Sequence, residues 1–365
     1  MLDETFYRIA LQYQDALGNK VIKKLIQHCG SAQSLFASSS NSFFRKNILG
    51  KTLPKPVLTD KIYSLAEKEY KWIEKHGVNL CFFTDDNYPK RLKNCNDFPY
   101  MFYYKGDGFF NRSKVVAVVG TRSASDYGYD IVKKLISEIA GYDISVVSGL
   151  AMGIDTMAHE QSLSFGLNTV AVLGSGLGVI YPPSNIKLAN RIIEYGGTII
   201  SEFPHEMIPD KINFPKRNRI IAGMADATIV VETAKKGGSV ITAYLAHSYN
   251  RDVFAVPGSI FTPLQDGCHE LIRSNIACLL NSGEHLIEMM GWNSSPPKAV
   301  QRELFVELDE NEEKIVKIIK MHQDISVDEI IQCCNELTPS KVAGLLLGLE
   351  LKGVVECKPG KIYRL

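Results

Sequence analysis

The stretch KVVAVVGTRSAS, residues 114–125, sets the fold class of this chain. Its uncharged run Val115–Val119, closed by Gly120, predicts a strand that is buried on both faces. Five similar runs follow, with helical patterns between them, for example at residues 129–140 and 155–164. This alternation predicts an α/β fold in which a doubly wound, extended Rossmann-like parallel sheet is covered by helices. The five later runs are ISVVSG (144–149), TVAVLG (169–174), GTIISE (197–202), ATIVVET (227–233) and DVFAVPG (252–258).

Further segments surround this alternation. Residues 1–75 show helical spacing punctuated by Gly18 and Gly30, which predicts an N-terminal helical domain, similar to a SAM-like module, with a polar loop at 38–47. Its glycine turn at 16–20 could offer N–H groups to phosphate, although a plain helical bundle explains it more simply. Residues 76–291 form the sheet domain, and the apolar stretches 78–83 and 99–104 are expected to be strands that lead into the sheet.

The C-terminal part carries different signals. A linker is expected at 292–301, and residues 302–365 show three helical patterns and a terminal hairpin, which together predict a winged helix. Thr338 as cap and Pro339 at the first helical position mark the start of the third helix. That helix has one cation and many apolar residues, and residues 301–365 hold 9 Lys/Arg against 12 Asp/Glu. We therefore expect this domain to contact protein, a second copy or a partner, and not to read duplex DNA.

Composition excludes several classes of protein. The 365 residues are 45% hydrophobic and 22% charged with a net charge of +1, as in an ordinary globular protein that must bind any polyanion through a local patch. No run of about 18 uncharged apolar residues exists and the acidic N-terminus lacks a signal-peptide pattern, so we expect a cytoplasmic protein without a membrane span. The eight cysteines form no CxxC pair, and Cys268-His269 has no second cluster at ligand spacing, so neither a metal site nor a cofactor is expected.

Glycine follows nearly every strand of the predicted sheet. The carboxyl ends of parallel strands form the ligand-binding edge, where glycine permits close approach and helix N-termini bind anions. Lys211 and the stretch FPKRNR (214–219), which follow the fourth run, form the densest cationic cluster of the central region. Arginine makes bidentate phosphate contacts and an aromatic ring stacks on bases, so we expect a basic loop facing a nucleic acid. The alternative is a solvated, lysine-rich loop without a binding function.

Enzyme functions are weighed against this interpretation. The first strand–helix turn is not GxGxxG and no GxxxxGK[ST] is present, which disfavours a dehydrogenase and a P-loop NTPase. A nucleotide N-glycoside hydrolase of the lysine-decarboxylase-like type shares this sheet, but the segment at 236–246 lacks the glutamate that such enzymes carry. His159 and Glu202 could be proposed as catalytic, although a structural role explains each more simply. We expect a binding protein, not an enzyme.

Six motifs in order carry a resemblance that covers the whole chain. They are GTRSAS (120–125), SGLAMGID (148–155), GSGLGVIYP (174–182), SEFP (201–204), FPKRNRIIAG (214–223) and AVPGS (255–259). The series resembles the DNA-processing protein A (DprA/Smf) family. The resemblance implies a non-catalytic, homodimeric protein of natural transformation that protects incoming single-stranded DNA and loads a RecA-type recombinase onto it.

The resemblance also implies a set of DNA-binding residues. Phe214 would stack a base, although a hydrophobic anchor for its loop is nearly as good an interpretation, and Arg219 could equally pair with Glu202 or Glu232. Gly237 and Met152 stand where the family often has Ser and Arg, and the second change removes a cation. Side-chain contacts are expected from Arg122, Lys211, Phe214, Arg217, Asn218 and Arg219, and backbone N–H contacts from the loops that hold Gly149, Gly153, Gly174, Gly176, Gly238 and Ser239.

Overall fold

The predicted strands lie side by side in one sheet of the computed structural model, which describes residues 3–37, 56–292, 308–322, 325–334, 337–352, 354–358 and 362–364. In the described residues the sheet has nine strands in the order β1-β2-β6-β5-β4-β3-β7-β8-β9. Neighbouring strands from β6 to β9 in this order pair parallel, whereas β2 pairs antiparallel with both β6 and β1. Their bounds are β1 Asn79–Phe82, β2 Met101–Gly106, β3 Lys114–Val119, β4 Ile144–Ser148, β5 Thr169–Leu173, β6 Thr198–Ser201, β7 Ala227–Val230, β8 Asp252–Ala255 and β9 Cys278–Leu279.

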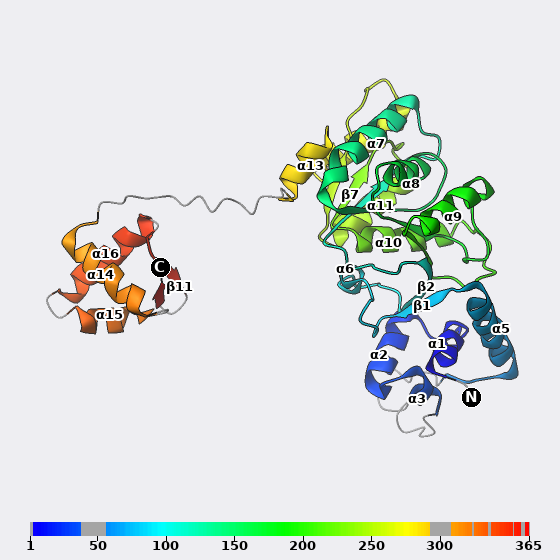
Figure 1. The fold of residues 1–365 in the computed structure, drawn as a ribbon, viewed down its shortest axis with the longest axis horizontal. Helices are drawn as coiled ribbons and strands as arrows, with labels where there is room; N and C mark the ends of the chain where they lie inside the picture. Colours follow the sequence, from blue (N-terminus) through cyan, green and yellow to red (C-terminus); the bar gives the residue numbers. More distant parts are fainter. Residues whose placement is uncertain are drawn as a thin grey trace. The chain divides into compact units, whose positions relative to one another are not determined.

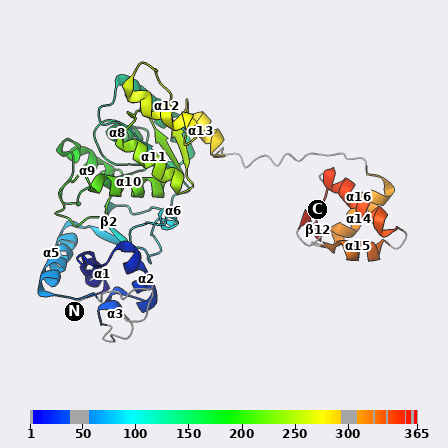
Figure 2. The same cartoon turned by 180° about the vertical axis from the view of Figure 1, so that it is seen from behind.

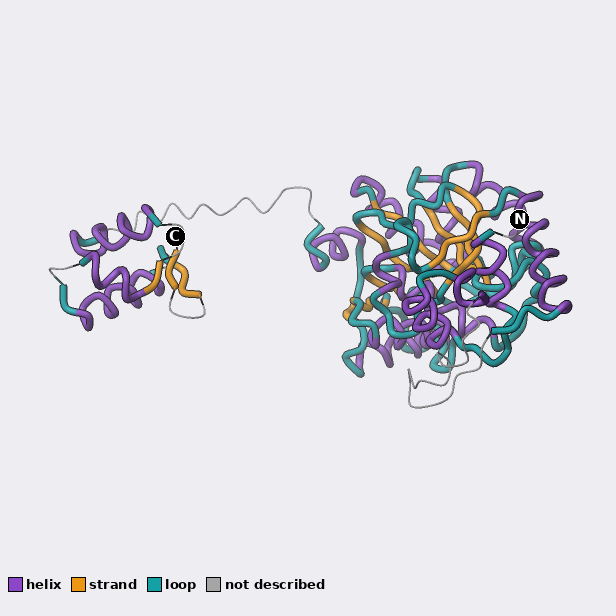
Figure 3. Tube along the Cα trace, turned by 90° about the horizontal axis from the view of Figure 1, so that it is seen from below, coloured by secondary structure: helices purple, strands orange, loops and turns teal. Residues whose placement is uncertain are grey.

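Helices cover both faces of the sheet, as the uncharged strands predict (Figure 1, Figure 3). On β3, Val116 and Val118 belong to one core, whereas Val115, Ala117 and Val119 belong to the other. The first core is completed by α7 (Asp126–Ile139), α8 (Ile154–Ser164) and α13 (Gly283–Met289), and the second by α10 (Asn213–Met224), α11 (Gly238–Ser248) and α12 (Asp266–Arg273). Helix α9 (Ile186–Glu194) packs on β5 and β6 in a smaller cluster. The predicted doubly wound parallel sheet is confirmed.

The strand order reverses beside β3. The chain passes from β3 through β4 and β5 to β6, and it then returns to the other side of β3 to form β7, β8 and β9. In open α/β sheets such a reversal leaves a crevice at the carboxyl ends of the strands, where ligands bind. The topology therefore directs attention to the loops that follow β3, β4 and β7.

The N-terminal helices share a core with the sheet. They are α1 (Glu4–Gln12), α2 (Asn19–Cys29), α3 (Ala32–Ala37) and α5 (Asp60–His76), and the expected loop at 38–47 lies outside the described residues. Phe6, Ile9 and Leu25 belong to the same cluster as Phe102 and Tyr103 of β2. Figure 2 shows these helices gathered next to β2. The strands β1 and β2, with the short helix α6 (Lys90–Lys93) between them, thus join the helical segment to the sheet.

A buried carboxylate ties α5 to the segment after β6. The carboxylate of Glu69 accepts a hydrogen bond of 2.9 Å from the backbone N–H of His205, and its Oε2 lies 2.6 Å from His205 Nδ1. Both residues are buried, and the ring of Trp72 stacks on that of His205 at 4.5 Å. The segment that carries Lys211 therefore begins at a fixed point.

The C-terminal unit, Ser295–Leu365, has its own core. It contains α14 (Glu310–Met321), α15 (Val327–Cys333) and α16 (Pro339–Leu351), with a three-stranded sheet in the order β10 (Ile325–Ser326), β12 (Ile362–Arg364), β11 (Glu356–Lys358). Ile315, Ile330, Val342 and Leu346 form the centre of that core. Three helices with a terminal hairpin make the predicted winged helix. The expected linker at 292–301 lies almost wholly outside the described residues.

Among the described residues, no helix is both long and apolar enough to cross a membrane.

Replacing Phe102 tests whether the lead-in strands belong to the main fold. Its ring is fully buried on β2 against Tyr88 and Phe110, so Phe102→Ala should lower the free energy of unfolding by about 3–5 kcal/mol. Urea denaturation should show the sheet unfolding in a single transition that is shifted to a lower urea concentration. Phe109→Ala is the matched control, since Phe109 is 58% exposed, and should change stability by about 0.5 kcal/mol or less. A separate early transition in Phe102→Ala, with the main one unmoved, would contradict a shared core.

Candidate functional site

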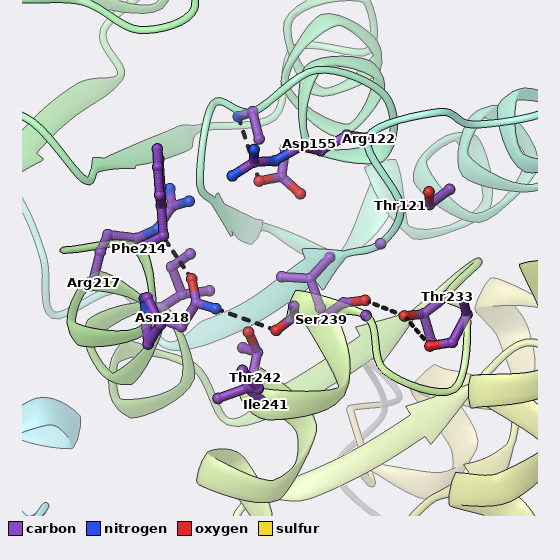
Figure 4. A pocket seen from close by; sticks show the side chains of 18 residues that line it. Thr121, Arg122, Asp155, Phe214, Arg217, Asn218, Thr233, Ser239, Ile241 and Thr242 are labelled. Atoms are coloured by element: carbon purple, nitrogen blue, oxygen red, sulfur yellow. Dashed lines mark hydrogen bonds between the residues drawn. The ribbon is translucent and has the colours of Figure 1, made fainter. Parts of the chain in front are cut away.

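A cavity of about 260 Å³ opens at the reversal of strand order (Figure 4). Its walls come from residues 119–122 at the end of β3, from Ala151 and Asp155 after β4, from the first turns of α10, and from residues within 233–242, which lie after β7 and in the first turns of α11. All of these segments follow the carboxyl ends of parallel strands. The cavity therefore occupies the crevice that the topology predicts.

The cationic stretch 214–219 is helical, and the expectation of a basic loop is wrong. Helix α10 spans Asn213–Met224, and Pro215 is accommodated because residues in the first turn need no intrahelical N–H partner. Helical spacing directs Phe214, Arg217, Asn218 and Ile221 toward the cavity. Lys216 and Arg219 line a different cavity on the side of α2. The helix thus divides the cationic cluster between two flanks.

Phe214 and Arg122 meet at the cavity although 92 residues separate them in the sequence. The guanidinium carbon of Arg122 lies 4.7 Å from the centroid of the Phe214 ring, a cation–π distance. Arg122 is exposed and makes no hydrogen bond or ion pair within the described residues, whereas Phe214 is half-buried. A Cβ atom at Gly174 would come within 2.9 Å of the ring, so this glycine provides clearance for Phe214.

Arg217 is enclosed by the protein, with only 4% of its surface exposed. Its Nη1 donates to the carbonyl oxygens of Gly149 and Val172, and its Nε donates to Asn218 Oδ1 at 3.1 Å. Burial lowers the pKa of Arg217 to about 10. The negative charge of Asp155 raises this pKa, and the positive charge of Arg122 lowers it. Gly149 has no room for a side chain, since a Cβ would come within 2.0 Å of Arg217 Nη1. Arg217 therefore braces α10 against the ends of β4 and β5.

Arg219 and Lys211 lie outside the cavity lining. Both carboxylate oxygens of Glu202 accept hydrogen bonds from Arg219 Nη2, and the carbonyl of Asp97 accepts one from Nη1. Of the two pairings considered, the structure has the one with Glu202. Glu232 instead accepts from the backbone N–H and hydroxyl of Ser125, at 3.0 and 2.6 Å, and so holds the loop that carries Arg122. Lys211 is exposed just before α10.

The glycine loops differ in what they can offer an anion. The N–H of Gly149 donates to Asp155 at 3.2 Å and that of Gly176 to the carbonyl of Met207 at 2.9 Å, so both are already used. Gly153 adopts a φ of 76° where a Cβ would come within 2.3 Å of the carbonyl of Thr121. Gly238 and Ser239 begin α11, which has no acidic residue in its first turn and no side-chain cap, and they line the cavity. The N-terminus of α11 is thus the anion-favouring end of a helix dipole that faces the cavity.

The two residues weighed as catalytic have structural contacts. His159 is fully buried, its Nδ1 lies 2.7 Å from Thr169 Oγ1, and burial lowers the pKa of its imidazole to about 3. Glu202 is engaged by Arg219 and by Asn19 Nδ2 at 3.0 Å. Neither lines the cavity beside Phe214. Among the described residues, no group of three His, Cys, Asp or Glu side chains could hold a metal ion.

Asp155 lines the cavity, although it is not among the DNA-binding residues expected from the sequence. Its Oδ2 accepts from the backbone N–H groups of Gly149 and Ala151, at 3.2 and 3.4 Å. Burial raises the pKa of this carboxyl, and Arg217 opposes the rise. Its place in SGLAMGID, at the start of a helix, was the only available signal. Asn218 also links two walls, since its Nδ2 donates to the carbonyl of Gly238 at 3.3 Å.

Arg217 and Arg122 should differ sharply in their effect on stability. Arg217→Ala leaves the carbonyls of Gly149 and Val172 without their donor, so it should lower the free energy of unfolding by about 2–4 kcal/mol. Arg122→Ala removes an exposed side chain and should change it by about 0.5 kcal/mol or less. Chemical denaturation of both variants checks this difference. Equal, small effects would show that Arg217 does not brace the site.

Known protein families were compared with the whole chain. A family model described as DNA recombination-mediator protein A matches residues 79–291, and one described as DprA winged helix domain matches residues 296–361. Protein Smf of Escherichia coli is 32% identical over 303 residues, covering 82% of this chain and 80% of the relative. DNA processing protein DprA of Streptococcus pneumoniae is 43% identical over 206 residues, covering 56% of this chain and 71% of the relative.

Solved structures agree with these matches. The X-ray structure of DNA processing protein A from Streptococcus pneumoniae has a TM-score of 0.63 at 32% identity, covering 78% of this chain and 97% of that one. A structure of DNA processing protein A from Helicobacter pylori, described as giving insights into its single-stranded DNA binding mode, has a TM-score of 0.53 at 28% identity and covers 58% of this chain and 95% of that one. The first family model alone spans more than half of the chain. The chain therefore belongs to the DNA recombination-mediator protein A (DprA) family.

Proposed function

We propose that this protein binds single-stranded DNA at the cavity between α10 and α11, without reading its sequence. The observation that carries the proposal is the exposed Arg122 lying over the Phe214 ring at a cavity faced by the N-terminus of α11. The cation and the helix N-terminus match phosphates, and the aromatic face matches bases. The single-stranded DNA binding mode described for the Helicobacter pylori relative supports this choice of ligand.

Within this proposal the side chains have separate roles. Arg122 and Lys211 are exposed and contact phosphates, and Phe214 stacks a base once Arg122 moves from its ring to a phosphate. Arg217 and Asn218 shape the walls of the cavity, because their polar atoms already hold backbone groups, and Arg219 outside it is bound to Glu202. Met152 is 52% exposed in a small hollow beside Phe214 and supplies apolar contact where the family often has a cation.

The wider role is also part of the proposal. Family membership, with a model described as a recombination mediator, supports protection of incoming DNA in the cytoplasm during natural transformation and its transfer to a RecA-type recombinase. The protein acts as a homodimer and without catalysis. Helix α16 exposes Leu347 and has one cation, Lys341, so the winged helix contacts protein.

Removing the charge of Arg122 at the cavity, or of Lys211 just before α10, tests the phosphate contacts. Arg122→Ala and Lys211→Ala should each weaken binding of an oligothymidylate and flatten the log–log salt dependence by about 0.7 to 1, the value for one phosphate contact. Phe214→Ala should weaken binding by about 1–3 kcal/mol with the salt slope unchanged, because stacking releases no counterion. Fluorescence anisotropy at several salt concentrations measures both quantities.

The matched control is Lys133→Ala, an exposed lysine on α7 that lines none of the described cavities. It should leave affinity and slope unchanged. Unchanged binding in folded Arg122→Ala and Lys211→Ala would overturn the assignment of the cavity.

Removal of the winged helix tests its proposed role. A chain ending at Ser295 retains the whole first unit, Met1–Ser294, and should keep most of its affinity for single-stranded DNA. The same anisotropy titration compares it with the full chain, and circular dichroism confirms that the shortened chain is folded. Loss of nearly all affinity in a folded truncated protein would assign DNA contacts to the winged helix.

A further inference from the structure

A second, larger cavity lies on the other flank of α10. Its volume is about 780 Å³, within the range of ligand sites, and its walls come from α1, α2, the start of β2, the segment after β6 and α10. We call it the α2 cleft and define it by Lys20 and Lys23 of α2, Asp97, Glu202, and Lys216 and Arg219 of α10. None of these residues lines the cavity beside Phe214.

The α2 cleft has an excess of positive charge. Four cations line it against two carboxylates, Asp97 and Glu202. Glu202 is paired with Arg219, and Asp97 Oδ1 accepts from the hydroxyl of Tyr249 at 2.6 Å. The side chains of Lys20 and Lys216 are exposed and make no hydrogen bond or ion pair with the residues that the structure describes. Two cations thus line the cleft without a side-chain partner among the described residues.

Lys23 is the buried cation of the α2 cleft. It is 7% exposed, its Nζ donates to the carbonyl of Phe98 at 2.8 Å, and it lies 3.2 Å from the centre of the Phe98 ring. Burial lowers the pKa of Lys23 to about 8. The positive charges of Arg219 and Lys20 also lower this pKa, whereas the negative charges of Asp97 and Glu202 raise it. An anion in the cleft would offset these positive charges.

We propose that the α2 cleft is a second phosphate-binding site, which holds the part of a DNA strand that extends beyond the nucleotides bound beside Phe214. Residues 214 and 217 line the first cavity and residues 216 and 219 the second, so both sites share α10 as a wall. A helix with its side chains is about 10–12 Å wide, a span that a few nucleotides cross. Pro215, which lines the first cavity, is exposed next to Lys216, which lines the second.

This inference rests on the proposed function, and strand length separates the two. A short strand fills one cavity, whereas a long strand reaches both. Oligothymidylates of about 4 and about 16 nucleotides, the span of single-strand site sizes, serve as probes for the full-length protein. Lys20→Ala/Lys216→Ala should leave affinity for the short probe unchanged. The double substitution should weaken binding of the long probe about tenfold. It should also flatten the log–log salt dependence of that binding by about 1.4, twice the value for one single-strand phosphate.

The matched control is Lys61→Ala/Lys75→Ala, which removes two exposed lysines of α5 that line neither cavity. It should leave both probes unaffected, which excludes an effect of net charge alone. Equal weakening of short and long probes by Lys20→Ala/Lys216→Ala would overturn the second site, as would an unchanged slope for the long probe. Inorganic phosphate is tested as a competitor of the long probe. If phosphate competes but the double variant binds DNA as the wild type does, the cleft binds a free anion, and the proposed second DNA site is overturned. Absence of binding to either probe by the wild-type protein would instead overturn the proposed function.

Discussion

The arrangement of this site depends on the buried guanidinium of Arg217. It donates to carbonyls at the ends of β4 and β5 and fixes α10 over the crevice between them. An arginine in this position replaces water that the strand ends would otherwise need, and an unpaired carbonyl there would destabilise the fold. Phe214 lies one turn earlier on the same helix, so its position follows from that of Arg217. Arg217, one of the six side chains expected to contact DNA, is thus bound to the protein backbone and positions Phe214.

The cations near the two cavities fall into two groups, those whose donors are bound to protein oxygens and those that are exposed. Arg217 and Arg219 are held by carbonyl and carboxylate oxygens, whereas Arg122, Lys20, Lys211 and Lys216 are exposed. An arginine with its donors satisfied gains little from a phosphate, because it would exchange one set of hydrogen bonds for another. The exposed cations lose only water and counterions when they bind. The affinity of the proposed interface therefore resides in few side chains.

The fold was predictable because it depends on local patterns. The run at 114–120 becomes β3, and Thr338-Pro339 begins α16, since burial on both faces and helix capping leave signatures in short segments. The helix at 213–224 was missed because Pro215 and the density of cations resemble a loop, while the strand ends that stabilise it are about 45 and 68 residues away in the sequence. The cation–π contact of Arg122 with Phe214 and the α2 cleft likewise join distant segments. The pairing of Arg219 with Glu202 was one of two alternatives, and only the packing of α10 selects it.

The contact between Glu69 and His205 has a consequence for the entropy of ligand binding. The segment from His205 to Asn213 carries Lys211, and it is held at one end by a buried carboxylate and at the other by α10. The two ends of this segment are already fixed when the protein folds. The conformational entropy of closing the segment is therefore lost on folding and not on ligand binding. In the proposed interface, a lysine on such a short, doubly anchored span would search little space before it meets a phosphate. If the proposed site binds DNA, α5, which lines neither the cavity beside Phe214 nor the α2 cleft, would in this way affect how readily the site is occupied.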